Sequence, residues 1–441
     1  MAARLDYAVM PGGSLQGTLR VPGDKSISHR ALMLGAIAEG DTEIEGFLDG
    51  ADCLSTLAAI RAMGIQVDAV STTSLKVHGR GLRGLQAPTA ALDCGNAGTA
   101  MRILMGLLAG QGFESTLVGD ESLSRRPMRR VIDPLMSMGA RIDSRDGLAP
   151  ITLHAVRPLK PARHVLKVAS AQVKSALLVA GLYANGYTWI KEPGQSRDHT
   201  ERMLRSFGVH LIRESGWLGI NGGERLEGTR IEVPADLSSA AFFLAGAAMC
   251  PGSQVTIQNV GVNPSRDGVI RILRLMGAQI EIRHSRLGGG EPAADITVKG
   301  GRLRGVDITP ELVTLAIDDI PAVLVAAACA EGTTRVHGAA ELRVKESDRL
   351  QAMQDGLAAM GVKVDTTPDG INVSGSPHLK GGDIDSHGDH RIAMAFAMAG
   401  LRAESPMLIR DCANVDTSFP GFVELARGAG LQVTARKAEA A

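Results

Sequence analysis

Several residue types are scarce in this chain of 441 residues, and each scarcity argues against a class of protein. Cysteine occurs five times without a CxxC pair, so we expect reduced thiols in a cytosol and neither a disulfide framework nor a zinc site. Aromatic residues make up 3% of the chain and leave few platforms for stacking nucleic-acid bases. Charge of one sign is not in excess either, since 47 basic residues balance 47 acidic ones, so no general basic field attracts nucleic acid.

Long apolar runs are missing as well. The longest, such as residues 240–250, reach about half the length that a membrane span needs. The first six residues contain no apolar signal-peptide core. We therefore expect a cytoplasmic protein that binds neither membranes nor nucleic acid.

Glycine, in contrast, is abundant, with 53 residues, and six of these glycines mark a repeat. In each case a helical stretch ends at the glycine and a short β-like run follows; the six are Gly64, Gly139, Gly208, Gly277, Gly361 and Gly430. They lie 69 to 84 residues apart, and a second helix-to-strand junction precedes each of them in phase. Glycine after a helix is a common stop signal. The pattern predicts six units, each with a helix, a strand, a second helix and then two or more strands.

The six units fall into two halves. Residues 21–26 (VPGDKS) resemble residues 233–238 (VPADLS), and both segments precede an apolar helix. We expect one domain over residues 23–235 and a second formed by residues 1–22 plus 236–441. The N-terminal strand region lies outside the first half and is expected to pair with the second. The two connections, near Pro22 and Pro234, would then act as a hinge.

Polar and charged clusters open the helices of these units. The first helices begin with the segments 25–30, 96–102, 170–174, 238–239, 318–319 and 389–391. Four arginines precede the second helices at equivalent positions: Arg126, Arg197, Arg266 and Arg349. If the units of a half pack about one axis and the two halves face each other, helix N-termini and basic side chains would line one cleft. Such a cleft binds anions, so we expect a ligand with several negative charges.

A plainer interpretation stays open for part of this set. Ser, Asp and Asn at helix starts are often ordinary N-caps, which applies to Ser238, Ser239 and Asp389. His29, His199 and His390 fit a capping role as well. The remaining basic residues are interpreted as solvated surface: Arg129, Arg130, Arg202 and Lys160.

Two acids contrast with their basic surroundings. Asp318 precedes the apolar segment 320–330, and Glu346 lies between Lys345 and Arg349. A carboxylate in an anion site repels the ligand, so it is better explained by proton transfer than by binding. A local salt-bridge network is the structural alternative.

The motifs resemble those of the 3-phosphoshikimate 1-carboxyvinyltransferase family, also called the EPSP synthase family. The resemblance runs from about residue 10 to 435 with the motifs in order; they are Gly23-Asp-Lys-Ser-Ile-Ser-His-Arg30, Gly95-Asn-Ala-Gly-Thr-Ala-Met-Arg102, Arg126-Pro-Met128, Ser170-Ala-Gln-Val-Lys174, Arg197-Asp-His-Thr-Glu201, Leu342-Arg-Val-Lys-Glu-Ser-Asp-Arg349 and Asp389-His-Arg391. It implies an α/β fold (α+β by some schemes). This fold is a two-domain inside-out α/β barrel of six βαβαββ repeats, three per domain about a pseudo-threefold axis.

The resemblance also implies a reaction. The enolpyruvyl group of phosphoenolpyruvate is transferred to the 5-hydroxyl of shikimate 3-phosphate, and phosphate is released, in the shikimate pathway to aromatic amino acids. The reaction is an addition–elimination through a tetrahedral intermediate. No cofactor and no metal are implied, and a monomer is expected. The first half is expected to supply most of the contacts to shikimate 3-phosphate.

Site residues follow from the matching motifs. Asp318 is implied as the base toward the 5-hydroxyl, and Glu346 and Lys25 as the groups that exchange protons with the methylene carbon. The division of labour between Glu346 and Lys25 stays open. Residues implied for shikimate 3-phosphate are Lys25, Ser26, Arg30, Ser170, Ala171, Gln172, Arg197, Asp318 and Lys345. Residues implied for phosphoenolpyruvate are Lys25, Asn96, Gly98, Arg126, Gln172, Arg349 and Arg391.

The chain departs from the family pattern at a few positions. Thr417 stands where many relatives carry a lysine of the phosphoenolpyruvate site. Several motifs resemble a glyphosate-tolerant subgroup, but Ser265 replaces its usual threonine and Gly98 resembles the sensitive subgroup. The response to glyphosate is therefore left open.

Two other functions remain as alternatives. The paralogous UDP-N-acetylglucosamine 1-carboxyvinyltransferases usually have Lys-Asn where this chain has Lys25-Ser26, and often a cysteine in a loop where residues 112–130 contain none. A non-catalytic anion-binding protein would have no need of Asp318 and Glu346 in a basic site.

Overall fold

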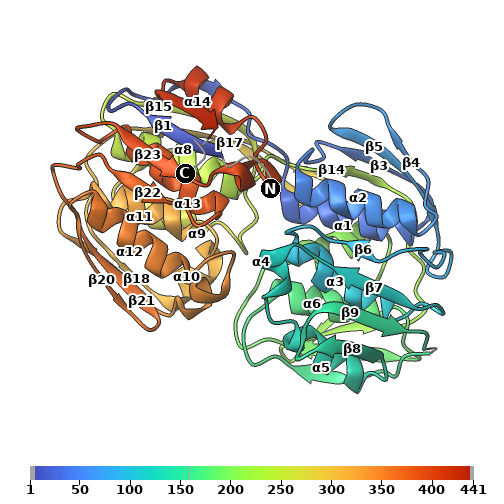
Figure 1. The fold of residues 1–441 in the computed structure, drawn as a ribbon. Coiled ribbons are helices and arrows are strands. Elements are labelled where there is room, and N and C mark those ends of the chain that lie inside the picture. Colours follow the sequence, from blue (N-terminus) through green and yellow to red (C-terminus); the bar gives the residue numbers. More distant parts are fainter. Residues whose placement is uncertain (1–4, 157, 438–441) are drawn as a thin grey trace. The chain divides into compact units, whose positions relative to one another are not determined.

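The computed structural model describes residues 5–156 and 158–437, which form two compact units (Figure 1). The N-terminal unit consists of residues 23–234 and 287–291. The C-terminal unit consists of residues 5–22, 235–286 and 292–437. Each unit has its own hydrophobic core. No helix within the described residues is long and apolar enough to cross a membrane.

The division differs from the expected one in two places. Ala235 belongs to the C-terminal unit, and residues 287–291 belong to the N-terminal unit. The latter segment is the tip of the hairpin of strands β16 (Gln279–Gly288) and β17 (Glu291–Lys299). The difference arises because the repeat pattern predicts the strands of this hairpin but carries no information about what its tip contacts.

The described residues form six four-stranded sheets with one common plan. In each sheet the first two strands in the order below are parallel, and the second and third are antiparallel. The sheets of the N-terminal unit are β14 (Arg230–Glu232), β3 (Glu39–Glu45), β5 (Ser74–Arg80) and β4 (Val67–Ala69); β6 (Leu92–Asp93), β7 (Ser115–Val118), β9 (Leu148–His154) and β8 (Arg141–Arg145); and β10 (Arg163–Val165), β11 (Tyr187–Lys191), β13 (Trp217–Asn221) and β12 (Leu211–Glu214).

The C-terminal unit repeats this plan three times. Its sheets are β2 (Gln16–Leu19), β15 (Gln254–Gly261), β17 and β16; β18 (Asp307–Ile308), β19 (Thr333–Val336), β21 (Gly370–Ser374) and β20 (Lys363–Thr367); and β22 (Asp383–Asp385), β23 (Met407–Arg410), β1 (Leu5–Val9) and β24 (Val433–Lys437). The N-terminal strand β1 lies between β23 and β24 and completes the sixth sheet.

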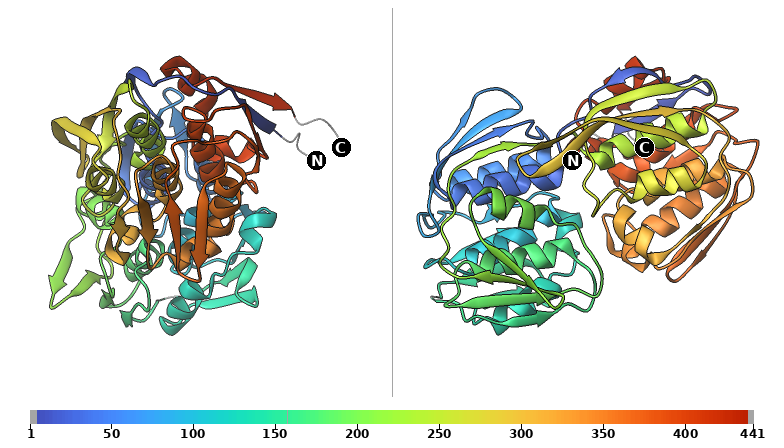
Figure 2. Two further views of the ribbon diagram at one scale, coloured as in Figure 1. Left: turned by 90° about the vertical axis from the view of Figure 1, so that its left-hand side faces the viewer. Right: turned by 180° about the vertical axis from the view of Figure 1, so that it is seen from behind.

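One helix of each repeat is buried inside its unit, with the sheets outside (Figure 2). These helices are α1 (Lys25–Ala36), α3 (Gly98–Leu108), α6 (Ala171–Gly181), α8 (Leu237–Met249), α11 (Ile320–Ala328) and α13 (His390–Ala399). Helix α8 shows why: it is apolar on every face, all its residues are buried, and it packs against both α11 and α13. The six sheets and six buried helices confirm the predicted inside-out fold.

The second helix of each repeat ends at the glycine that marked the repeat in the sequence. These helices are α2 (Ala51–Ala62), α5 (Arg129–Ser137), α7 (His199–Ser206), α9 (Gly268–Leu275), α12 (Arg349–Ala359) and α14 (Phe422–Ala429). All six glycines have a positive φ, between 80° and 115°. The residue after each glycine donates its N–H to the carbonyl five residues back, as Ala278 does to Leu273 at 2.9 Å. This is the Schellman helix end, which favours glycine because L side chains are strained at positive φ.

Four further short elements lie within the repeats. They are α4 (Glu121–Ser124), α10 (Pro310–Ala316) and the 3₁₀ helices η1 (Ala340–Val344) and η2 (Ala413–Thr417). Elements α4, η1 and η2 each precede the second helix of their repeat, whereas α10 precedes the buried helix α11. Element η1 leads directly to residues 345–349 of the candidate site.

Candidate active site

In the N-terminal unit, the start of α1 fixes a lysine against a carboxylate. Asp24 caps the helix by accepting the N–H of Ile27 at 2.9 Å. Lys25 follows, and its Nζ lies 2.8 Å from Oδ2 of Asp52 in the first turn of α2. Both side chains are largely buried, with 16% and 7% of their surface exposed. The pair holds the lysine ammonium at the helix N-terminus.

One turn further along α1, Arg30 is buried among neutral oxygen atoms. Its guanidinium donates to Thr200 Oγ1 at 2.7 Å, to Ser175 Oγ at 2.9 Å and to the Ser26 carbonyl at 2.7 Å. Burial lowers the pKa of Arg30 to about 10, which leaves it charged at neutral pH. Because these three contacts are to neutral groups, the positive charge is solvated and not cancelled by them, which suits a nearby anionic ligand.

Helix α3 begins at a glycine that is crowded by two arginines. A Cβ atom on Gly98 would lie 3.2 Å from Arg126 Nη1 and 3.4 Å from Arg102 Nη1. Arg126 also donates to Asn96 Oδ1 at 2.7 Å, and the Asn96 amide donates to Asp120 at 2.7 Å. The absence of a side chain at Gly98 therefore lets two guanidinium groups approach the N-terminus of the helix.

The start of α6 is tied to α3 by a glutamine. Ser170 caps α6 by accepting the N–H of Val173, and Ala171 is the first helical residue. Gln172 donates from Nε2 to Thr99 Oγ1 at 2.9 Å and accepts from Arg102 at 2.5 Å. These contacts bring the predicted residues of the second and third repeats together. Arg197 is half-buried in the loop before α7.

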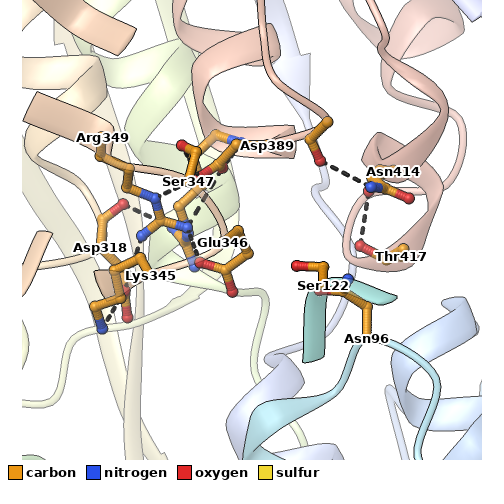
Figure 3. A network of polar contacts seen from close by, with 12 residues as sticks. Asn96, Ser122, Asp318, Lys345, Glu346, Ser347, Arg349, Asp389, Asn414 and Thr417 are labelled. Atoms are coloured by element: carbon orange, nitrogen blue, oxygen red, sulfur yellow. Dashed lines mark hydrogen bonds and ion pairs between the residues drawn. The ribbon is translucent and has the colours of Figure 1, made fainter. Parts of the chain in front are cut away.

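In the C-terminal unit, a buried arginine binds three carboxylates (Figure 3). Arg349, the first residue of α12, is 1% exposed. Its Nε donates to Asp389 at 2.8 Å, its Nη1 to Asp318 at 3.3 Å, and its Nη2 to Glu346 at 2.5 Å. Burial lowers the pKa of Arg349, but the carboxylates of Asp389, Glu346 and Asp318 outweigh burial, so the pKa is raised overall. The guanidinium thus orients both acids that the sequence singled out.

Asp318 is held by further contacts. Lys345 Nζ lies 3.3 Å from its Oδ1, as Figure 3 shows. Its backbone carbonyl accepts from Arg391 Nη1 at 2.9 Å, and the same arginine lies 3.6 Å from Asp319. The carboxylate keeps 16% of its surface exposed, so it is oriented by cations and still reachable.

Some residues for which the sequence also allows a plain role, as a helix cap or a surface group, make further contacts in the structure, and others do not. Asp389 caps α13 and also binds Arg349 and Ser347, so it has both roles. Ser238 does not cap α8, because Asp236 does; its hydroxyl accepts from the buried Arg266 at 2.8 Å. The surface interpretation is confirmed for Arg129, Arg130 and Lys160, while Arg202 is partly buried beside Asp198.

The position that lacks the family lysine lies in η2. Thr417 Oγ1 donates to the Asn414 carbonyl at 2.7 Å, and the Asn414 amide donates to the Gly388 carbonyl at 2.8 Å (Figure 3). These contacts fix the turn before α13 but supply no positive charge.

Several partners were not predicted from the sequence. Asp52, Thr99, Ser175 and Thr200 hold the predicted side chains, and Asp389 holds Arg349 although the sequence indicates only a cap or a ligand contact for it. Thr200 lies within the motif of residues 197–201, so the sequence does indicate that it belongs to the site. Nothing in the sequence indicates this for Asp52 and Ser175, because their partners are 27 and 145 residues away. The described residues contain no group of three or more His, Cys, Asp or Glu side chains arranged to hold a metal ion.

Comparisons with known proteins identify the family of this chain. The family model "EPSP synthase (3-phosphoshikimate 1-carboxyvinyltransferase)" matches residues 9–425. The chain is 58% identical over 436 residues to the 3-phosphoshikimate 1-carboxyvinyltransferase of Alkalilimnicola ehrlichii, covering 99% of this chain and 98% of that protein. It is 57% identical to the enzyme of the same name from Methylococcus capsulatus, with 97% and 98% coverage.

Solved structures give the same result. An EPSP synthase from Acinetobacter baumannii matches with a TM-score of 0.88 and 49% identity, covering 98% of this chain and all of that one. The enolpyruvyl transferase NikO from Streptomyces tendae matches with a TM-score of 0.81 at 18% identity, which shows a shared fold.

Proposed function

Since the chain belongs to the EPSP synthase family, we propose that it transfers the enolpyruvyl group of phosphoenolpyruvate to the 5-hydroxyl of shikimate 3-phosphate. The products are 5-enolpyruvylshikimate 3-phosphate and inorganic phosphate. The names of the relatives support the activity, and the chemistry of the described side chains supports the roles assigned below.

The observation that carries the mechanism is the contact of Arg349 with both Asp318 and Glu346. The reaction needs one group that takes a proton from an alcohol and another that gives a proton to carbon. Two carboxylates anchored on one buried, permanently charged guanidinium supply oriented acid–base groups at fixed positions.

We propose that the reaction proceeds by an addition step and an elimination step. Asp318 takes the proton of the 5-hydroxyl, whose oxygen attacks C2 of phosphoenolpyruvate, while C3 gains a proton from Glu346 or Lys25. This gives a tetrahedral intermediate with a methyl group. A proton then leaves the methyl group to Glu346 or Lys25, the C2–O bond to phosphate breaks, and the double bond forms again.

The basic and amide residues of the N-terminal unit fit the binding of two anions. We assign shikimate 3-phosphate to residues around Arg30 and the start of α6, and phosphoenolpyruvate to residues around Gly98. In full, the first set is Lys25, Ser26, Arg30, Ser170, Ala171, Gln172 and Arg197, and the second is Lys25, Asn96, Gly98, Arg126 and Gln172. From the C-terminal unit we assign Asp318 and Lys345 to the first substrate and Arg349 and Arg391 to the second. These cations offset the charge of phosphate and carboxylate groups as they react.

Place of action and assembly form part of the same proposal. The five cysteines lie within the described residues as free thiols, which supports a reducing compartment, the cytoplasm. We propose that the protein is a monomer, because the candidate site residues of each unit all belong to this one chain.

Phosphate release tests the function. The purified protein is mixed with phosphoenolpyruvate, with or without shikimate 3-phosphate, and inorganic phosphate is measured. We expect release only when both are present. UDP-N-acetylglucosamine in place of shikimate 3-phosphate is the control acceptor, and release with that acceptor alone would assign the chain to the paralogous reaction.

A further inference from the structure

The hairpin tip that joins the N-terminal unit is packed on helix α7. Ser206 Oγ donates to the Gly289 carbonyl at 3.1 Å, and Arg202 donates to the Gly290 carbonyl at 3.2 Å. A Cβ atom on Gly290 would lie 2.7 Å from Ser206 Oγ. The tip therefore approaches α7 closely because Gly290 has no side chain.

Directly after these glycines, a buried hydrogen bond between a glutamate and a histidine closes the contact. Glu291 Oε1 lies 2.7 Å from His199 Nδ1, and the two side chains are 3% and 2% exposed. His199 is the first residue of α7. Its other ring nitrogen, Nε2, has no hydrogen-bond partner among the described residues, so Glu291 supplies the hydrogen bond that fixes the orientation of the ring.

The same helix start holds a substrate-binding arginine. Thr200, next to His199, accepts from Arg30 Nε at 2.7 Å and exchanges a hydrogen bond of 2.6 Å with Ser175. Glu201, the next residue, lies 2.9 Å from Lys174 on α6. Three consecutive residues of the 197–201 motif thus each contact a different element: the hairpin tip, α1 and α6.

We propose that Glu291 is a positioning residue for shikimate 3-phosphate: through His199 it fixes the start of α7, and through Thr200 it fixes the guanidinium of Arg30. This proposal rests on the proposed function, which assigns Arg30 and Arg197 to that substrate. Glu291 touches neither substrate in this account and acts through the helix start.

Electrostatics alone predicts the opposite effect, which makes the proposal testable. Burial lowers the pKa of Arg30, and Glu291 is one of the carboxylates that counteract this effect. The negative charge of Glu291 is therefore felt at the anion site. Removing the charge without moving any atom would strengthen the binding of an anionic substrate. Loss of positioning would weaken it.

The test compares Glu291→Ala and Glu291→Gln with the wild type. Glu291→Ala removes the acceptor of the His199 hydrogen bond together with the charge, whereas Glu291→Gln removes the charge but keeps a carbonyl oxygen that can accept the same bond. In Glu291→Ala we expect the KM for shikimate 3-phosphate to rise about 10-fold, while the KM for phosphoenolpyruvate and kcat stay within about threefold. In Glu291→Gln the KM for shikimate 3-phosphate should be unchanged or lower, and calorimetric titration should show the same difference between the two variants. Glu281→Ala, on the exposed part of the same hairpin, is the matched control and should behave as wild type.

A second variant separates positioning from charge. Gly290→Ala retains Glu291 and His199 but forces the tip away from Ser206, so it should raise the same KM. The single variants Glu291→Ala and His199→Gln are also compared with the double variant Glu291→Ala/His199→Gln. The rise in KM in the double variant should match the larger of the two single rises and not their product, because both residues act through one contact.

Three results would overturn the proposal. They are an unchanged or lower KM for shikimate 3-phosphate in Glu291→Ala, independent effects in the double variant, and a lower melting temperature with unaltered kinetics, which would show a purely structural pair. Inactivity of the wild type with both substrates is a different outcome, because it contradicts the proposed function itself.

Discussion

The ammonium group of Lys25 lies 2.8 Å from the carboxylate of Asp52, and both side chains are largely buried. Lys25 opens α1 and Asp52 lies in the first turn of α2, so two helices of the first repeat meet at this pair. The long, flexible side chain of Lys25, which we propose for proton transfer, gains a fixed direction from such a partner.

Asp52→Asn should therefore reduce turnover without unfolding the protein. We expect kcat to fall about 10- to 100-fold, because the amide holds Lys25 less firmly and the ammonium leaves its productive position. Steady-state kinetics with both substrates measures the effect, and Asp49→Asn, at an exposed position before α2, is the control. Wild-type kcat in Asp52→Asn would show that the pair only stabilises the fold.

Glu346→Gln tests the acid–base role of that carboxylate. The amide can still accept from Arg349 but cannot exchange a proton, so kcat should fall about 10²- to 10⁴-fold. Binding of shikimate 3-phosphate, measured by calorimetry, should change little. A kcat within about fivefold of wild type would show that Glu346 only takes part in the ion pairs of Arg349 and transfers no proton.

Gly98→Ala tests the phosphoenolpyruvate subsite. The added methyl group would stand 3.2 Å from Arg126 Nη1 and 3.4 Å from Arg102 Nη1, so at least one guanidinium must shift. We expect a higher KM for phosphoenolpyruvate and a larger rise in Ki for glyphosate, which is longer in its extended form. In a crowded site, one additional carbon changes the binding free energy of a ligand by about 1–3 kcal/mol. Equal fold-changes in this KM and this Ki would show that Gly98 does not line the part of the subsite that distinguishes the two ligands. Thr417 would then be the next position to test.

Two surface histidines make stability depend on pH. The ring of His78 bridges Asp68 at 2.7 Å and Asp41 at 2.8 Å, and His154 bridges Asp143 and Glu114, each at 2.8 Å. Hydrogen bonds from the histidine rings to these carboxylates, led by those to Asp68 and Asp143, raise the pKa of both histidines above 6.5. A raised folded-state pKa adds stability that is complete below about pH 6.5 and is lost as the pH rises through the folded value.

The melting temperature should therefore contain a component that decreases as the pH rises above about 6.5. The double variant His78→Gln/His154→Gln should lose that component, and His337→Gln, at an exposed position, should keep it. Parallel curves for the double variant and the wild type would show that these bridges do not contribute to stability.

The sequence predicted the repeats well because the signal for them is local. Gly277 ends a helix with a positive φ, a conformation that depends on the residue type and its neighbours in sequence, and five other glycines do the same at regular intervals. The partners of the site residues are not local. Nothing near Lys25 in the sequence points to Asp52, and nothing near His199 points to Glu291, which is 92 residues away. Such contacts depend on how the repeats pack against one another. The spacing of glycines and polar residues along the sequence does not reveal this packing.

The most direct test of the account follows hydrogen at the methylene carbon. If C3 of phosphoenolpyruvate gains and then loses a proton at Glu346 or Lys25, a reaction in D₂O passes through a CH₂D group that retains deuterium when a protium leaves. We expect deuterium in the enolpyruvyl methylene of the product, detected by mass spectrometry and NMR, only when both substrates are present. Product formed at the normal rate with no deuterium at that carbon would contradict it.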